Sequence, residues 1–573
     1  MLTGLNLRRC KVDVAYKPED ILGFEPMNMV YSLSPDKQND IIFVKENVHL
    51  KDGTKQVNKR IVKNYKRKFW VAKEGQRTYK DKQQWESIEN LMEFSCAQHE
   101  LSRRINQALG RSWFTGGLRD TLASPYVYGA TISSTCLLRK EYRTKFPEAV
   151  SPKADVAVLD IETDVLHGTN KTILIALTFK DKVFCGIKRS FLNTTAISDD
   201  IEVKRIREKL DYYLEEYFVK RNVNLNLYFG DTSGEIIDAC LQQAHKWSPD
   251  FVAIWNMDFD IPRMEADLIS DGYDPAISFS DPAVPSEYRK FKYNPGPQVK
   301  TTHSGKQTPV ATENKWPTVD TTSCFFIIDA MCLYAKLRAA GGKEESYALD
   351  AVLKRIIKMG KLKGETGDFL EGLEWHIDMQ RNHKLLYIAY NIFDCIGIEL
   401  LDEKTGDISS AFIPQSEDSD WVDFNSNPRQ IADGMHFHCL NSGYVVGSAA
   451  GDLRDELDEL VVKPKGWIVT LDAFLAQDIG LPIIKELPNK QTMATIHNAD
   501  LDIEGTYPSV QAEMNACKQT TIREIVAIEG LDELEKRTIG VNLSAGIVNS
   551  CSISQTAFKV PNKKTLLEAF LSR

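Results

Sequence analysis

The chain has 573 residues, of which 43% are hydrophobic and 26% are charged, and its formal net charge is −9. This length exceeds one ordinary hydrophobic core, so we expect two to four globular domains. The negative net charge excludes a nucleic-acid-binding protein that is basic over its whole surface. Apolar runs are too short for a membrane span, and the first residues lack a signal-peptide core, which predicts a cytoplasmic protein without a membrane partner. The eleven cysteines include no C-x-x-C pair, so we expect reduced thiols.

Residues 1–152 mix short strand-like runs with a helical stretch at 87–109, and we expect them to form an N-terminal domain. Within this region, residues 51–73 hold nine Lys or Arg residues and one Asp, with interleaved aromatic residues. Basic side chains contact phosphates and aromatic rings stack on bases, so the segment suggests a DNA-binding surface. A solvated strand face with a few core aromatic residues explains the pattern equally well. The candidate DNA-binding residues are Lys66, Arg67, Lys68 and Trp70.

Residues 153–405 alternate apolar, β-branched runs with amphipathic stretches. This order predicts an α/β (α+β) domain, and residues 296–322 read as a long exposed loop. The expected strands are 154–162, 172–179, 181–187, 225–231 and 251–260, and the expected helices are 199–218, 235–248, 344–360 and 380–401.

Acidic residues end or interrupt three of these apolar segments. Asp160 and Glu162 alternate along one strand and therefore share a face. Asp260 comes at the end of another apolar strand, and Tyr390 and Asp394 are neighbours on one face of a helix. If the fold brings the four carboxylates together, their repulsion requires cations. Mg²⁺ and Mn²⁺ prefer oxygen ligands, and a pair of such ions promotes phosphodiester hydrolysis.

The three segments read DIET (160–163), NMDFD (256–260) and YNIFD (390–394). In this order they resemble the three exonuclease motifs in the proofreading domain of family B DNA polymerases. The resemblance extends to replicative polymerases of tailed bacteriophages over nearly the whole chain. The stretches that carry this extension are SPYVYG (124–129), FIIDAMCLYAKL (326–337), SYALDAVL (346–353) and MGKLKGE (359–365).

The resemblance implies an RNase H-like 3′–5′ exonuclease domain at 153–405 that holds two Mg²⁺ ions, with Mn²⁺ as a substitute. Tyr390 would orient the attacking water, and Lys361 would lie near the scissile phosphate, where a lysine stabilises developing charge. A solvated loop lysine is the alternative for Lys361. Phe259 is expected to pack beneath the site. The implied metal ligands are Asp160, Glu162, Asp260 and Asp394.

Residues 406–573 are expected to form a linker and an incomplete polymerase palm. The stretch DLDIEGTYPSV (500–510) resembles polymerase motif A, which implies that Asp502 binds metal and nucleotide and that Tyr507 stacks under the incoming sugar. An edge strand followed by a Tyr-Pro turn is the alternative. Only 71 residues follow Asp502, and they contain no second carboxylate cluster, clear fingers helix or thumb. The chain therefore resembles the N-terminal portion of a polymerase, which predicts a second polymerase chain.

Two further stretches resemble functional motifs, but their sequence context does not favour those functions. YFGDTSG (228–234) resembles a palm metal motif, but its position between the first two exonuclease motifs favours a strand followed by a turn. HFHC (436–439) places two histidines on one face of an expected strand, and without a nearby partner pair we expect core or surface histidines rather than a zinc site.

The leading functional hypothesis is a DNA replication protein: a family B DNA-directed DNA polymerase portion whose proofreading exonuclease removes mispaired 3′ nucleotides. Its expected partners are primer–template DNA, single-stranded DNA, dNTPs once the palm is complete, a second polymerase chain and a sliding clamp. A bacteriophage protein of this kind would work in the host cytoplasm. The alternatives are a stand-alone 3′–5′ exonuclease with a relic palm and a non-enzymatic DNA-binding scaffold.

Overall fold

A computed structural model defines the fold, and contacts divide the chain into two compact units, Met1–Gly451 and Asp452–Arg573. The domain boundaries expected at 152/153 and 405/406 both fall inside the first unit and stay predictions. The residues that the structure describes are 17–80, 83–111, 117–192, 199–301, 306–342, 344–360, 362, 372–416, 418–448, 483–484, 494–495, 522–524, 538–543, 546–552 and 557–559.

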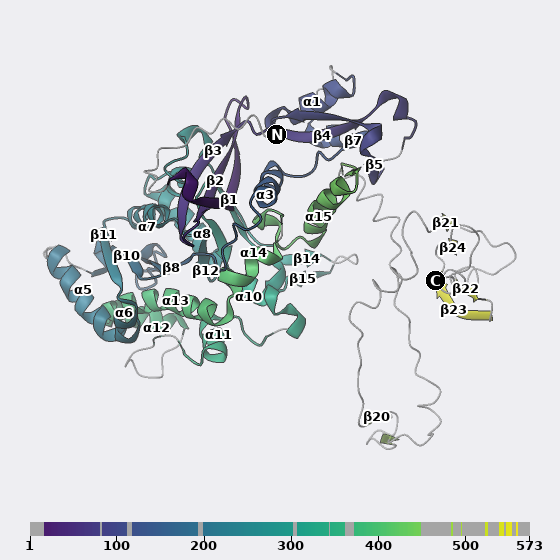
Figure 1. The fold of residues 1–573 in the computed structure, drawn as a ribbon. Helices are drawn as coiled ribbons and strands as arrows, with labels where there is room; N and C mark the ends of the chain where they lie inside the picture. The colour runs from purple at the N-terminus through teal and green to yellow at the C-terminus, as the bar shows by residue number, and fades with distance from the viewer. Residues whose placement is uncertain are drawn as a thin grey trace. The chain divides into compact units, whose positions relative to one another are not determined.

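The first unit begins with two small antiparallel sheets (Figure 1). One sheet has the order β1-β2-β3, and β4 is the central strand of the other, which has the order β6-β4-β7. Strand β2 of the first sheet has apolar side chains on both faces. Ile42 and Val44 pack against helix α3, whereas Ile41 and Phe43 pack against the central sheet described below. Their bounds are β1 Ile21–Leu33, β2 Asp40–Leu50, β3 Lys55–Lys63, β4 Arg67–Ala72, β6 Leu91–Cys96, β7 Val127–Tyr128 and α3 Ser134–Lys145.

A six-stranded mixed sheet organises the centre of the unit, with the strand order β11-β10-β9-β8-β12-β17. Strand β9 runs antiparallel to both of its neighbours, β8 and β10. On one side β12 and β17 continue parallel to β8, and on the other side β11 lies parallel to β10. The sequence-based strand predictions are confirmed here within one or two residues, except at β12, which is shorter. The bounds are β8 Val156–Thr163, β9 Thr172–Phe179, β10 Lys182–Lys188, β11 Asn224–Gly230, β12 Phe251–Ile254 and β17 Phe326–Asp329.

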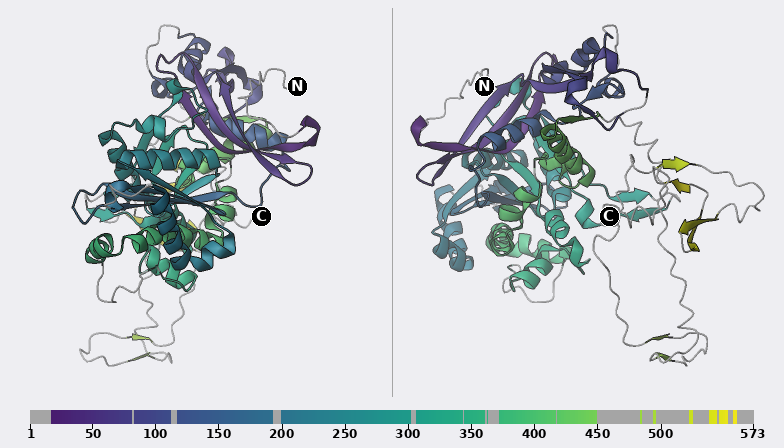
Figure 2. Two further views of the ribbon diagram at one scale, coloured as in Figure 1. Left: turned by 90° about the vertical axis from the view of Figure 1, so that its left-hand side faces the viewer. Right: turned by 45° about the vertical axis from the view of Figure 1, so that its right-hand side comes forward.

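Helices cover both faces of this sheet, as the left view of Figure 2 shows. Helices α7 and α8 pack on the face that receives Leu159 and Ile161 of β8. Helices α5 and α13 pack on the opposite face, which receives Val158. The mixed α/β class expected from the sequence is therefore confirmed. The bounds are α5 Asp199–Tyr213, α6 Glu215–Arg221, α7 Ser233–Trp247, α8 Met257–Ser270, α11 Leu349–Ile356, α12 Gly372–Asn382 and α13 Lys384–Thr405.

Shorter elements connect these layers. The antiparallel pairs β13–β16, β14–β15 and β5–β18 lie outside the central sheet. The bounds are α1 Leu101–Ala108, α2 Leu118–Leu122, α4 Arg189–Leu192, α9 Pro275–Ser278, α10 Ala330–Leu337, α14 Phe412–Gln415, α15 Asn427–Asn441, β5 Trp85–Ser87, β13 Phe291–Asn294, β14 Val299–Thr301, β15 Gln307–Pro309, β16 Thr318–Thr321 and β18 Tyr444–Val446.

Three predictions of secondary structure are wrong. Residues 87–109 form strand β6 and helix α1 instead of one helix, because Phe94 alternates with exposed polar side chains and pairs with Phe69 of β4. Residues 296–322 contain the β14–β15 hairpin and β16 instead of an unbroken loop. The HFHC stretch lies in helix α15 instead of a strand.

The second unit contributes only short antiparallel pairs to the described part of the chain. These are β19–β20, β21–β24 and β22–β23, with the bounds β19 Ile483–Ile484, β20 Ala494–Thr495, β21 Ile522–Glu524, β22 Thr538–Leu543, β23 Gly546–Ser552 and β24 Ala557–Lys559.

Within the described part of the chain, no helix combines the length and apolar character needed to cross a membrane.

Candidate metal centre between strand β8 and helix α13

Strand β8 presents two carboxylates on the face that helix α13 covers. Successive side chains of a strand point to opposite faces, so Asp160 and Glu162 share the face of Val158. Val158 belongs to the core cluster that contains α13. Asp160 is half-buried, whereas Glu162 is only 9% exposed. The apolar strand β8 can therefore end in two acidic residues, because their side chains meet polar groups of helix α13.

Helix α13 is buried without interruption from Leu386 to Ile398, unlike an amphipathic surface helix. Polar side chains within this buried part need partners, because an unpaired polar group away from water is costly. Tyr390 and Asn391 come three and four residues after Tyr387, and Asp394 comes four and three residues after them, so all four lie on one side of the helix. This side faces the carboxylates of β8.

Three carboxylates converge between the two elements. One carboxylate oxygen from each of Asp160, Glu162 and Asp394 lies within 4.8 Å of the others, in the geometry of a site that could hold a metal ion. Asp394 is only 3% exposed. Three negative charges at this separation repel one another strongly in a partly buried site. The cluster therefore favours a bound cation.

Hydrogen bonds from α13 orient both carboxylates of β8. The Nδ2 group of Asn391 donates to Oδ2 of Asp160 at 2.8 Å. The hydroxyl of Tyr387 donates to Oε2 of Glu162. A carboxylate has about four lone-pair sites, so such a contact is compatible with a cation bound at the same group.

Helix α12 supports the Tyr387 hydroxyl from the other side. Nδ1 of His376 lies 2.8 Å from that hydroxyl oxygen, and Nε2 of Gln380 donates to it at 3.3 Å. Because the single proton of Tyr387 goes to Glu162, His376 must be the donor in its contact. Gln380 also donates to the Thr163 carbonyl at 2.8 Å. The end of β8 is therefore held by a connected polar network.

Tyr390 lies beside the cluster with its ring parallel to that of Tyr387, at a centroid distance of 5.9 Å and an interplanar angle of 2°. Burial raises the pKa of the Tyr390 phenol, and the negative charges of Asp394, Glu162 and Asp160 raise it further. The hydroxyl therefore keeps its proton at neutral pH and remains a hydrogen-bond donor beside the carboxylates.

Asp260 lies in a different element than expected. It lies in the first turn of α8, after β12 has ended at Ile254, so its placement at the end of a strand is wrong. The early strand end has a physical reason, because the carboxylate of Asp329 caps the chain by accepting from the Met257 N–H at 2.9 Å. Asp260 is 5% exposed and follows the strand that pairs with β8. It does not belong to the three-carboxylate group.

The expectation for Phe259 is wrong, because its side chain is 49% exposed instead of packed beneath a site. Successive residues of a helix point in different directions. In the first turn of α8, Asp260 takes the buried direction and Phe259 the exposed one.

The proposed DNA-binding residues of the basic segment divide into two pairs. Arg67 and Trp70 are 1% and 5% exposed, so these two are wrong as surface contacts. Arg67 instead donates to Oε1 of Gln98 at 2.7 Å. Lys66 and Lys68 are exposed, and they form ion pairs with the chain's own glutamates at 3.4 and 2.8 Å. Arg67 and Lys68 lie on opposite faces of β4, and Trp70, on the face of Lys68, is buried because Tyr128 and Val445 cover it.

The remaining predicted site residues, Lys361, Asp502 and Tyr507, lie outside the described residues. The YFGDTSG stretch is strand β11 followed by a turn into α7, as predicted. His436 is buried in α15, and burial lowers its pKa to about 4, which agrees with the expected core histidine.

Sequence reasoning missed the residues that orient the carboxylates. Tyr387 and Asn391 carried a signal, since they share the helical spacing of Tyr390 and Asp394. His376 and Gln380 carried none, because they come from a different helix and meet the site only through the fold.

No protein-family model matches the chain, and a search of curated proteins finds no match to it.

Proposed function

We propose that the chain is a 3′–5′ exonuclease-bearing portion of a family B-type DNA polymerase, with an RNase H-like domain built on the central sheet. The observation that carries the proposal is the convergence of Asp160, Glu162 and Asp394 from two distant segments. Each segment alone is a weak signal. Their meeting at one point is what a nuclease site requires and what a solvated surface does not.

The sheet supports the fold part of the proposal. Five strands lie side by side in the order β10-β9-β8-β12-β17. The first three along the chain, β8, β9 and β10, each pair antiparallel with the next, and β12 and β17 then run parallel to β8. This is the strand arrangement that we expect of an RNase H-like domain. It puts the acidic end of β8 in the middle of the sheet, beneath α13.

The donor set fits Mg²⁺, with Mn²⁺ as a substitute, because all three side chains offer carboxylate oxygens. Asp160, Glu162 and Asp394 would hold metal, and Asp260 would contribute from the start of α8. Two bound ions would supply an activated water and stabilise the leaving 3′ oxygen of the terminal nucleotide.

The chain's own residues would position these groups. Asn391 and Tyr387 fix the carboxylate oxygens of Asp160 and Glu162, which leaves little reorganisation when substrate binds. Tyr390 would keep its proton and donate a hydrogen bond to the attacking water or to the phosphate. Lys361 would stabilise charge on the phosphate oxygens if its loop reaches the site.

The wider polymerase function rests on the motif A resemblance around Asp502 and Tyr507. We propose primer–template DNA and single-stranded DNA as partners, and dNTPs, a second polymerase chain and a sliding clamp for synthesis. A stand-alone exonuclease would have the same carboxylate cluster, whereas a non-enzymatic scaffold gives no reason for it.

The test is a gel assay of the purified chain on a 3′-mismatched primer–template with Mg²⁺, with and without dNTPs. We expect primer shortening, which Asp160→Ala abolishes while DNA binding persists. Asp231→Ala is the matched control, because this aspartate is exposed and follows β11, the edge strand three positions from β8 in the sheet. Equal nuclease rates for Asp160→Ala and the unmodified chain would overturn the site assignment.

Primer extension in the presence of dNTPs would instead show that the chain completes a polymerase site by itself. Shortening that is unaffected by dNTPs would support the need for a second chain.

A further inference from the structure

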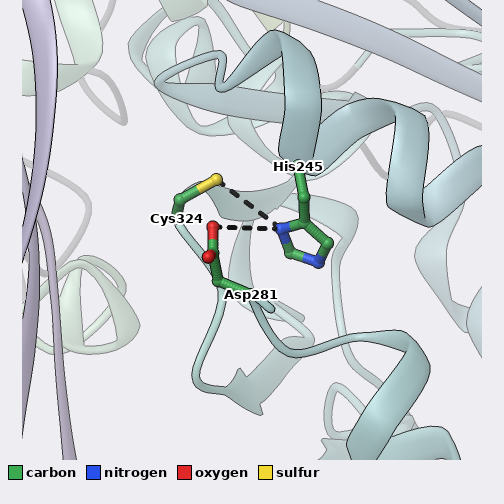
Figure 3. Close-up of side chains that lie close together, drawn as sticks. All are labelled: His245, Asp281 and Cys324. Atoms are coloured by element: carbon green, nitrogen blue, oxygen red, sulfur yellow. Dashed lines mark hydrogen bonds and ion pairs between the residues drawn. The ribbon is translucent and has the colours of Figure 1, made fainter. Parts of the chain in front are cut away.

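A second group of ligand-type side chains lies on the other face of the central sheet, at the end of α7. His245, Asp281 and Cys324 meet there from three separate segments (Figure 3). His245 belongs to the last turn of α7, Asp281 to the loop after α9, and Cys324 to the loop before β17. The three side chains are 2%, 1% and 0% exposed.

Nδ1 of His245 is directed at both other side chains. It lies 3.6 Å from Sγ of Cys324 and 3.6 Å from Oδ2 of Asp281. The nitrogen–oxygen distance is too long for a good hydrogen bond, which has its mode near 2.9–3.0 Å. A single ring nitrogen also cannot serve two partners well. His245 therefore bonds Asp281 only weakly through Nδ1, and its contact with the Cys324 sulfur is at the long distance usual for sulfur.

The two separations from Nδ1 of His245 match a tetrahedral zinc ion. Zinc binds thiolate sulfur at about 2.3 Å and imidazole nitrogen at about 2.0–2.1 Å, so two such ligands lie roughly 3.6 Å apart at the tetrahedral angle. The corresponding nitrogen–oxygen separation is about 3.4 Å, close to the observed 3.6 Å. Sulfur and nitrogen donors select zinc over Mg²⁺.

Neighbouring contacts orient two of the candidate ligands, Asp281 and His245. The N–H of Ala283 donates to Oδ1 of Asp281 at 2.8 Å, which directs Oδ2 toward His245. The ring of His245 stacks on Phe325 at a centroid distance of 4.9 Å. The backbone N–H of Asp281 donates to the Thr322 carbonyl at 2.9 Å and ties the two loops together. Such outer contacts are typical of metal sites.

A cavity of about 440 Å³ borders the cluster on the side of His245 and Asp281. His245 and Asp281 line it, together with Ser248 and Lys59. It provides an entry path and space for a water as the fourth ligand, which three-ligand zinc sites commonly hold.

Lys59 of β3 is the cation that balances the site without metal. Its Nζ lies 2.7 Å from Oδ2 of Asp281 and donates to the His245 carbonyl at 3.0 Å. The ammonium therefore competes with an entering ion for the carboxylate, and removing it should tighten metal binding.

We propose that His245, Asp281 and Cys324 bind one Zn²⁺ ion, which fastens the end of α7 to the two loops beside it. Burial raises the pKa of the Cys324 thiol to about 12, so zinc binding releases the thiol proton to solvent. This site is separate from the proposed nuclease centre, and its failure would leave that centre intact.

The test is a titration of the full chain with Co²⁺ in place of Zn²⁺, since a thiolate bound to Co²⁺ produces a near-ultraviolet charge-transfer band. We expect a band that saturates at one equivalent and disappears when Zn²⁺ is added. Carboxylate clusters do not produce this band, so the nuclease centre does not contribute. The absence of the band in the unmodified chain would overturn the proposal.

Variants assign the band to the cluster. Cys324→Ser, a nearly isosteric change, should weaken Co²⁺ binding by at least about a hundredfold, and His245→Gln should do the same with every thiol intact. Cys240→Ser is the matched control, because this cysteine is equally buried and lies on the same helix. A band that persists in Cys324→Ser, or vanishes in Cys240→Ser, would contradict the assignment. Lys59→Met should bind Co²⁺ more tightly than the unmodified chain.

Discussion

Two clusters of ligand-type side chains lie on opposite faces of one sheet, and they differ in donor chemistry and in construction. The cluster of Asp160, Glu162 and Asp394 offers only oxygen and comes from a strand and a helix. The cluster of His245, Asp281 and Cys324 offers nitrogen, oxygen and sulfur and comes from a helix end and two loops.

The difference indicates separate tasks for the two places. Oxygen ligands suit Mg²⁺, which keeps several waters and therefore stays available to a substrate phosphate. Mixed sulfur and nitrogen ligands suit zinc, which commonly stabilises folds. The neighbours of the two clusters also differ in charge. Lys59 forms an ion pair with Asp281, whereas the uncharged side chains of Asn391 and Tyr387 orient the carboxylates of β8.

The largest effect that separates the clusters should come from Asp394→Asn. The substitution removes one charge from the three-carboxylate group and nearly preserves the side-chain volume. We expect the nuclease rate to fall by at least about a hundredfold, because losing only an outer partner of a metal ligand costs about 10- to 100-fold. The measurement is single-turnover shortening of a labelled primer at saturating Mg²⁺.

The control measurement on Asp394→Asn is the Co²⁺ charge-transfer band of the other cluster, which should keep its intensity and stoichiometry in this variant. A simultaneous loss of band and nuclease would mean that the variant disturbs the whole sheet, and the two clusters would then not be independent.

The sequence predicts the first cluster far better than the second, for physical reasons. Asp160 with Glu162, and Tyr390 with Asp394, lie in regular elements whose periodicity states which residues share a face. The central strands were predictable for the same reason, since their apolar runs are long. Asp260 was assigned to the wrong element because an apolar strand can end before its sequence pattern does.

The second cluster has no such periodicity. His245, Asp281 and Cys324 are separated by 36 and 43 positions, and two of them lie in loops whose path depends on tertiary contacts. Arg67 and Trp70 failed for a related reason. A basic, aromatic stretch does not reveal which residues a small sheet turns inward.

Zinc should stabilise the fold, and Mg²⁺ should not do so through the same site. A ligand at 100 times its Kd stabilises the native state by about 2.7 kcal/mol, so we expect a higher thermal midpoint with Zn²⁺ in the unmodified chain. Thermal unfolding followed by circular dichroism, with and without Zn²⁺, measures the shift. Cys324→Ser should lose it and Asp394→Asn should keep it. An equal shift in Cys324→Ser would place the zinc elsewhere.

Tyr387→Phe tests whether the polar network matters to the oxygen cluster. It removes the hydroxyl that donates to Glu162 and leaves the ring that stacks on Tyr390. We expect a loss of about 10- to 100-fold in nuclease rate at low Mg²⁺, with partial recovery as the Mg²⁺ concentration rises. The measurement is the nuclease rate across a Mg²⁺ series.

The matched control for Tyr387→Phe is Tyr142→Phe, which removes another buried tyrosine hydroxyl that donates to a glutamate, here Glu46. This variant should lose stability without changing the Mg²⁺ dependence. If both variants shift the Mg²⁺ dependence equally, the effect is a general loss of stability and the positioning role of Tyr387 is wrong.

The smallest effect should come from the exposed lysines of the basic segment, which touch neither cluster. Lys66→Gln with Lys68→Gln removes two charges that are each already paired with a glutamate. Exposed pairs contribute at most about 1 kcal/mol, so stability should hardly change. If both side chains contact phosphates, the slope of log K against log salt falls by up to about 2. Single-stranded DNA binding across a salt series measures the slope. Lys204→Gln is the control, because Lys204 is an exposed side chain of α5. An unchanged slope would remove this segment from the DNA path and leave DNA contacts to the surface around β8 and α13.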